Sequence, residues 1–91
     1  MDTLNLDVPW ALHPQVSVRP EPFGALLYHF GTRRLSFLKD RKLLAVVEGL
    51  ADAPTARAAC AAAGVADADL PQFERALETL ASSSMLIERT T

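Results

Sequence analysis

The side chains that most often act as metal ligands or nucleophiles are few in this sequence: two histidines, His13 and His29, and one cysteine, Cys60. No cysteine, second histidine or carboxylate falls at a metal-ligand spacing near either histidine. Cys60 stands in the run Ala-Ala-Cys-Ala-Ala with no base beside it, which favours a small core-facing residue over a nucleophile. A single cysteine also excludes an intramolecular disulfide and a multi-cysteine metal site. We therefore predict a protein that is not an enzyme and needs no metal and no cofactor, with His29 on the solvent or partner face of its strand.

Basic side chains are concentrated in one short segment, although the chain as a whole has a formal net charge of −2. The segment from residue 33 to residue 42 contains one acid, Asp40, and five bases, which are Arg33, Arg34, Lys39, Arg41 and Lys42. A solvated strand end followed by a helix start would explain such a run. The functional alternative is a patch that steers an acidic partner toward this segment.

The segment from residue 67 to residue 78 is acidic, with Asp67, Asp69, Glu74 and Glu78 against one base, Arg75. In a helix-turn-helix protein this segment would be the helix that enters the DNA major groove. Phosphates would repel its carboxylates, so we expect no nucleic-acid partner. A winged-helix DNA-binding transcriptional regulator remains the alternative function.

One flank of the same helix carries mostly small side chains at helical spacing, and these are Gln72, Ala76, Thr79 and Ser83. Such a flank can form the floor of a shallow groove beside a strand at residues 34–38. If that strand lies at a sheet edge, its unpaired N–H and C=O groups can bind an extended peptide as an added strand. An ordinary half-exposed helix flank is the alternative interpretation.

The elements that would position these groups begin with three strands. Alternation at residues 16–18 predicts a short strand that Pro20 and Pro22 end. Residues 24–30 form the second strand, and residues 34–38 return after a hairpin in which Gly31 is free to take a positive φ. On the third strand, Leu35 and Phe37 point one way and Arg34, Ser36 and Leu38 the other. The core is expected to consist of Trp10, Leu26, Tyr28, Phe30, Phe37, Leu44, Phe73, Leu77 and Leu80.

Three helices follow. Asp40 caps a helix over residues 40–51, and Thr55 caps a second helix that ends before Gly64. A third starts near residue 69 with Pro71 in its first turn, and residues 85–87 add a terminal strand. This order predicts an α+β, winged helix-turn-helix-like fold, with a three-stranded antiparallel sheet followed by three helices.

The chain is long enough for one domain. We expect residues 1–11 to be a flexible N-terminal arm, with Trp10 folding back, and residues 12–91 to be the domain itself. The N-terminus lacks the apolar run of a signal peptide, and no stretch approaches the roughly 20 apolar residues of a membrane span. A cytoplasmic protein without a membrane partner is the simplest expectation.

The stretch Arg-Pro-Glu-Pro-Phe-Gly-Ala-Leu-Leu-Tyr-His-Phe at residues 19–30, followed by Arg-Leu-Ser-Phe-Leu at residues 34–38, closely resembles the mycofactocin-system peptide chaperones, the MftB family of PqqD-like recognition elements. The Ala-Ala-Gly-Val turn and the Leu-Pro-Gln-Phe-Glu-Arg-Ala-Leu helix fit the same family. The resemblance covers roughly residues 10–89, and the hairpin is its most specific part.

The resemblance implies a non-catalytic peptide chaperone that binds the leader of a ribosomally made precursor peptide, MftA-like, along its third strand. The chaperone would present this peptide to a radical S-adenosylmethionine enzyme, MftC-like, which acts on the C-terminal Val-Tyr and holds the iron–sulfur clusters itself. Transferred to this sequence, the expected peptide-binding residues are Arg33, Arg34, Leu35, Ser36, Phe37, Leu38, Gln72, Arg75, Ala76, Thr79 and Ser83. Without a guest, the open strand would allow a monomer or a weak homodimer.

Overall fold

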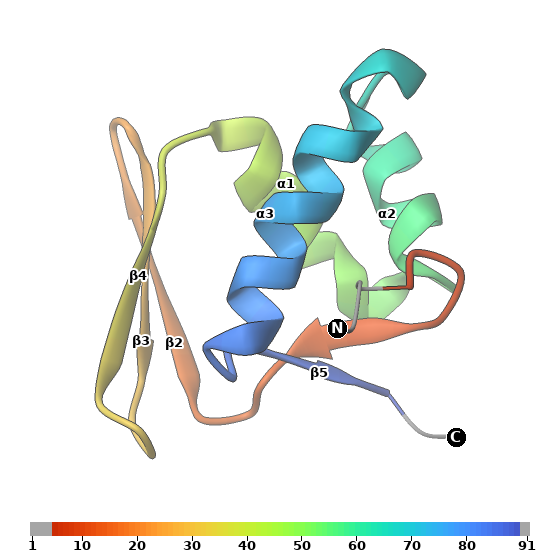
Figure 1. Ribbon diagram of the computed structural model, residues 1–91. Helices are drawn as coiled ribbons and strands as arrows, with labels where there is room; N and C mark the ends of the chain where they lie inside the picture. The colour runs from red at the N-terminus through yellow and green to blue at the C-terminus, as the bar shows by residue number, and fades with distance from the viewer. Residues whose placement is uncertain (1–4, 90–91) are drawn as a thin grey trace.

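The computed structural model of the chain describes residues 5–89, and its order of elements confirms the expected α+β class (Figure 1). Strands β2 (Val16–Glu21), β3 (Gly24–His29) and β4 (Arg34–Leu38) form an antiparallel sheet in that order. Helices α1 (Arg41–Gly49), α2 (Ala56–Ala62) and α3 (Leu70–Ser82) follow, with short 3-10 turns η1 (Leu50–Asp52) and η2 (Asp67–Asp69) between them. Two further strands, β1 (Trp10–Leu12) and β5 (Leu86–Glu88), pair with each other in a separate sheet.

Helix boundaries follow the signals in the sequence. The Asp40 side chain accepts a hydrogen bond of 2.7 Å from the Lys42 N–H at the start of α1. Thr55 does the same for Ala58 at the start of α2, with a distance of 3.1 Å. Gly64 follows α2 with φ 85°, and Pro71 occupies the first turn of α3. These caps satisfy amide groups that have no partner inside the helix, so the predicted starts are confirmed.

The buried face of the sheet is the opposite of the one expected. On β3 the buried side chains are those of Ala25, Leu27 and His29, with Gly24 also buried, whereas Phe30 is 61 % exposed. On β4 the buried residue is Leu38, and Phe37 is 59 % exposed. Leu38 belongs to the same buried core as Val46 and Val47 of α1, so the helices pack on the face that Leu38 occupies. Alternation predicts two faces but does not say which one a helix will cover, and the largest side chains mark the outer face here.

One local prediction about the sheet is also wrong, and the positive φ in the hairpin belongs to a residue other than Gly31. β2 continues through Pro20 to Glu21, because β2 is an edge strand and proline is tolerated where its nitrogen faces outward. In the hairpin, Arg33 takes the left-handed conformation with φ 61°, and its N–H donates to the His29 carbonyl at 2.7 Å. Gly31 does not have a positive φ.

His29 is buried, 3 % exposed, and not on the solvent face as predicted. Its Nδ1 accepts hydrogen bonds from the N–H groups of Gly31 and Thr32, at 3.0 Å each. The His13 ring lies against it with 4.4 Å between ring centroids. His29 therefore holds the β3–β4 turn from inside, a structural role that its place in an aromatic run did not reveal.

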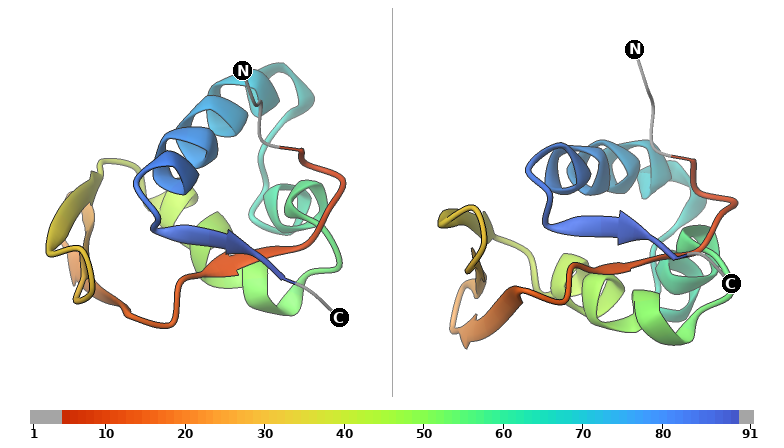
Figure 2. Two further views of the ribbon diagram at one scale, coloured as in Figure 1. Left: turned by 60° about the horizontal axis from the view of Figure 1, so that its bottom comes forward. Right: turned by 90° about the horizontal axis from the view of Figure 1, so that it is seen from below.

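The first and last segments of the described range, residues 5–12 and 86–89, are joined to the domain and to each other. β1 pairs antiparallel with β5, and the two strands lie side by side in Figure 2. Leu6 is buried, and backbone bonds join Leu6 and Val8 to the start of α2. The structure thus differs from a loose arm over residues 5–11, and residues 1–4 lie outside the described range. Trp10 does fold back onto the domain, since its side chain packs against the core, and its indole N–H donates to the Asn5 carbonyl at 3.0 Å.

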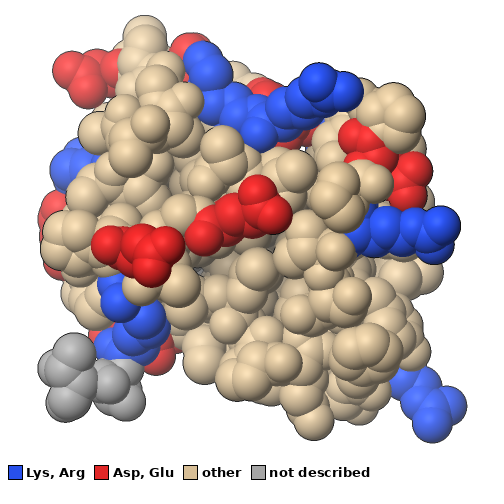
Figure 3. All heavy atoms as spheres, turned by 180° about the vertical axis from the view of Figure 1, so that it is seen from behind, with Lys and Arg blue, Asp and Glu red and all other residues tan. Residues whose placement is uncertain are grey.

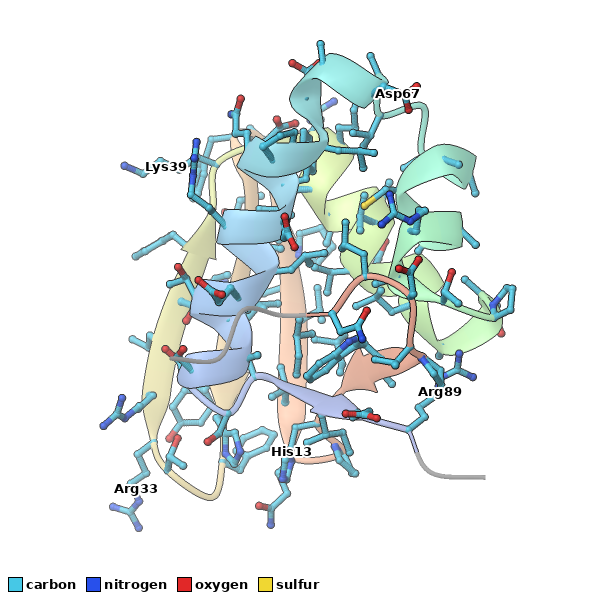
Figure 4. The ribbon with its side chains drawn as sticks, turned by 45° about the vertical axis from the view of Figure 1, so that its right-hand side comes forward. His13, Arg33, Lys39, Asp67 and Arg89 are labelled. Carbon is cyan, nitrogen blue, oxygen red and sulfur yellow. The ribbon has the colours of Figure 1, made fainter. Side chains whose placement is uncertain are left out.

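Arg89 fixes this end of the molecule through three backbone carbonyls. Its guanidinium donates to the carbonyls of Trp10 and Ala51, at 3.1 and 3.0 Å, and to that of Ala53. One side chain thereby connects β1 to the turn after α1 (Figure 4). Because these acceptors are backbone groups, no residue pattern in the sequence points to them.

Candidate peptide-binding site

β4 is an edge of the three-stranded sheet, which is the condition for binding a peptide as an added strand. Across β2 and β3, the Phe30 N–H donates to the Gln15 carbonyl at 2.9 Å. Backbone groups alternate sides along an antiparallel strand, so those of His29, Leu27 and Ala25 point toward β4. Their register partners on β4 are Arg34, Ser36 and Leu38. The backbone groups of Leu35 and Phe37 therefore point away from the sheet, toward the open edge.

The approach of Leu38 to Gly24 supports this assignment. A Cβ placed on Gly24 would lie 1.9 Å from the Leu38 carbonyl oxygen, and the Gly24 φ is 150°. The Leu38 carbonyl thus faces β3, in agreement with the alternation that turns Leu35 and Phe37 outward. Only glycine allows the two strands to come so close at this position.

A small hollow of about 60 Å³ lies between the start of α1 and α3. It is lined by Asp40, Leu43, Gln72, Phe73 and Ala76. Two of the expected groove residues, Gln72 and Ala76, are therefore brought together beside the end of β4. Phe73 and Leu43 also line the hollow, and neither was predicted. Each lies three residues from another lining residue, Ala76 or Asp40, and this helical spacing could have placed them on the same face.

Two other expected groove residues lie further along α3 and outside the lining of this hollow. The exposed Thr79 donates its hydroxyl back to the Arg75 carbonyl at 3.0 Å, and Ser83 forms the C-cap of the helix. The hollow therefore occupies only the first half of the flank predicted from Gln72 to Ser83.

Exposed basic side chains lie at both ends of β4. Arg33 and Arg34 occupy the hairpin end and Lys39 the end that leads into α1. Figure 4 shows Arg33 and Lys39 at opposite ends of the strand. The other two members of the basic segment bond to the protein itself: Arg41 donates to the Pro22 carbonyl and Lys42 to the Gly64 carbonyl, at 3.0 and 3.3 Å.

The side chains that could act as a nucleophile or as metal ligands do not form a reactive site within residues 5–89. Cys60 is fully buried, as predicted, and burial raises the pKa of its thiol. Within residues 5–89, no three histidine, cysteine or carboxylate side chains gather as metal ligands. No helix in the same range is long and apolar enough to cross a membrane.

Comparison with known proteins agrees with the resemblance seen in the hairpin. The family model described as "Peptide chaperone MftB family" matches residues 9–87. The chain is similar to the peptide chaperone MftB of Mycobacterium tuberculosis, with 65 % identity over 90 % of this chain and 75 % of the relative. It is similar to that of Mycobacterium ulcerans at 64 % identity over 86 % and 72 % of the two chains. It is similar to the peptide chaperone MftB of Mycolicibacterium smegmatis at 60 % identity over 93 % of this chain and 83 % of the relative.

No solved structure matches the chain. The family model covers most of the sequence, and its range includes β1, the whole hairpin, the hollow beside α3 and the first two residues of β5. On these grounds the chain belongs to the peptide chaperone MftB family.

Proposed function

We propose that this protein binds the leader of an MftA-like precursor peptide as a fourth strand on β4 and presents it to an MftC-like radical S-adenosylmethionine enzyme. The observation that carries the proposal is the open edge of β4, where no strand within residues 5–89 lies beside the backbone groups of Leu35 and Phe37 on the outer side. The hollow at Gln72 and Ala76 lies where side chains of an added strand would enter. The chain itself is non-catalytic in this role.

The hydrogen bonds of an added strand set only part of the affinity. Leu35 and Phe37 together offer two N–H and two C=O groups, so a guest forms up to four backbone bonds. At about 0.5–1.5 kcal/mol net for each bond, they contribute roughly 2–6 kcal/mol. A micromolar complex needs about 8 kcal/mol, and ordering the guest has a further cost. Side-chain contacts must therefore supply the remainder.

The direct test is a titration of the labelled protein with a synthetic MftA-like leader, followed by amide NMR shifts. We expect the largest changes at Arg34–Leu38 and along Gln72–Ser83. Changes confined to other elements would reject this site.

A proline substitution tests strand addition at a single amide. Leu35→Pro removes an outward N–H, and Leu35→Ala is the matched control that loses the side chain but keeps the N–H. We expect Leu35→Pro to bind the leader at least about fivefold more weakly than Leu35→Ala, which corresponds to about 1 kcal/mol for one lost hydrogen bond. Equal affinity of the two folded variants would argue against pairing at this position. Ser36→Pro is unsuitable because the Ser36 amide points toward β3.

A further inference from the structure

The outer face of strands β3 and β4 is apolar and exposed, whereas the outer face of β2 carries Ser17, Arg19 and Glu21. Leu35 is 58 % exposed, Phe37 59 % and Phe23 50 %. Tyr28 and Leu26 stand beside Leu35 and Phe37 on β3, and the rings of Phe23 and Phe37 are 6.0 Å apart. Together, Phe23, Leu26, Tyr28, Leu35 and Phe37 form one continuous surface, which we call the outer platform. Figure 3, seen from behind, shows broad uncharged surface on the half of the molecule where this sheet lies, with both acidic and basic side chains at its border.

The outer platform reaches the same edge at which the guest strand would pair. Neighbouring strands lie about 4.8 Å apart, and directly opposed side chains have Cβ atoms about 4.5–5.5 Å apart. A strand paired with β4 would therefore place alternate side chains next to Leu35 and Phe37 on the outer face. The intervening side chains would point toward α3 and the hollow.

The geometry points to a second recognition surface: we infer that the outer platform binds two large apolar side chains of the leader, two residues apart. This inference rests on the proposed function and states which leader segments the site accepts. The guest is an extended stretch of about five residues, the length of β4. It carries apolar side chains at positions i and i+2 to cover Leu35 and Phe37.

The charges at the two ends of β4 extend this description of the guest. Arg33 and Arg34 at one end and Lys39 at the other favour a carboxylate on each side of the apolar pair. An amphipathic strand with small or polar residues at i and i+2 would leave Leu35 and Phe37 exposed to water and would bind more weakly.

The test combines variants of the full-length protein with single-alanine variants of the synthetic MftA-like leader. Leu35→Ala and Phe37→Ala each remove part of the outer platform at exposed positions, so the fold remains intact by circular dichroism. Ile87→Ala on β5 is the matched control, because Ile87 is an exposed apolar residue outside this sheet. Ala76→Gln fills the hollow and reports on the α3 side independently.

We expect Leu35→Ala and Phe37→Ala each to raise the Kd of the leader about five- to tenfold, with Ile87→Ala unchanged. In double-mutant cycles, Leu35 should couple to one leader residue and Phe37 to another that lies two positions away.

Wild-type affinity of the Leu35 and Phe37 variants, together with weaker binding by Ala76→Gln, would overturn the inference and leave the proposed function standing. Unchanged affinity in all of these variants would overturn both. A change in sedimentation without a change in leader affinity would overturn the inference too, because a second copy of this chain would then be the occupant of the platform.

Discussion

Replacement of Arg89 by alanine tests how the chain ends are held. The substitution removes hydrogen bonds to the carbonyls of Trp10, Ala51 and Ala53, which belong to two different parts of the fold. A hydrogen bond to a charged group contributes about 1.5–3 kcal/mol when it is shielded from water. Ala51 is exposed, so water replaces that bond at little cost, whereas Trp10 and Ala53 are half-buried.

We therefore expect Arg89→Ala to lower the free energy of unfolding by about 2–3 kcal/mol, less than the full value of two shielded bonds. A domain of this size loses about 4–8 °C in Tm for each kcal/mol, so Tm should fall by about 10–20 °C. Thermal and urea unfolding, followed by circular dichroism, measure both quantities. Arg89→Lys should be intermediate, because an ammonium group cannot span three separated carbonyls.

Arg34→Ala is the matched control, since Arg34 is an exposed arginine on β4 and its loss should change stability by no more than about 0.5 kcal/mol. Amide hydrogen exchange adds a local measure: the protection of Trp10–Leu12 and Leu86–Glu88 should decrease first in Arg89→Ala. If Arg89→Ala and Arg34→Ala unfold at the same temperature, the three carbonyl contacts do not hold the ends together, and the reasoning is refuted.

Three other predictions concern burial and charge. Leu27→Ala should cost about 2.7–5 kcal/mol in urea unfolding, whereas Leu35→Ala on the outer face should change little; the reverse order would mean that the sheet faces are wrongly assigned. Arg57 holds the pKa of the Asp7 carboxyl below its usual value through a hydrogen bond and an ion pair of 2.8 Å. Because the pKa of Asp7 is lower in the folded than in the unfolded protein, its carboxylate stabilises the fold above the unfolded pKa near pH 4, and this stability is lost as the pH falls through the folded pKa. Asp7→Asn lacks this contribution. Its free energy of unfolding should therefore fall less between pH 6 and pH 2 in urea melts than that of the wild type. Burial raises the pKa of the Cys60 thiol, so this thiol should react slowly with a disulfide reagent at pH 8 and rapidly in urea, and fast labelling of the folded protein would contradict its placement.

The sequence predicted those parts of the fold that depend on local chemistry. The range of β4 is confirmed, because nearby residues bound it, with the hairpin turn before it and the Asp40 cap of α1 after it. The helix caps Asp40 and Thr55 are confirmed as well, because a cap depends only on a side chain that accepts a hydrogen bond from an amide N–H two or three residues further on. The terminal strand after α3 is confirmed for the same reason, since Ser83 and Ser84 end the helix before it.

The failures concern features that depend on distant segments. The strand pattern of residues 24–30 has large side chains on one face, and only the packing of α1 shows that the other face, with Ala25 and Leu27, is the core. His29 is buried because it holds a turn, and β1 exists because β5 lies beside it. At the site, Gln72 and Ala76 were found from helical spacing, but the outward direction of the Leu35 and Phe37 amides needed the strand register.

The pairing of β1 with β5 has a consequence for the order of folding. It joins residues about 75 positions apart, whereas the hairpin between β3 and β4 closes over only four residues. The entropy lost in closing a long loop delays such contacts until intervening segments are compact. The terminal sheet should therefore form late, and its contacts should control how quickly the folded domain opens more than how quickly it forms.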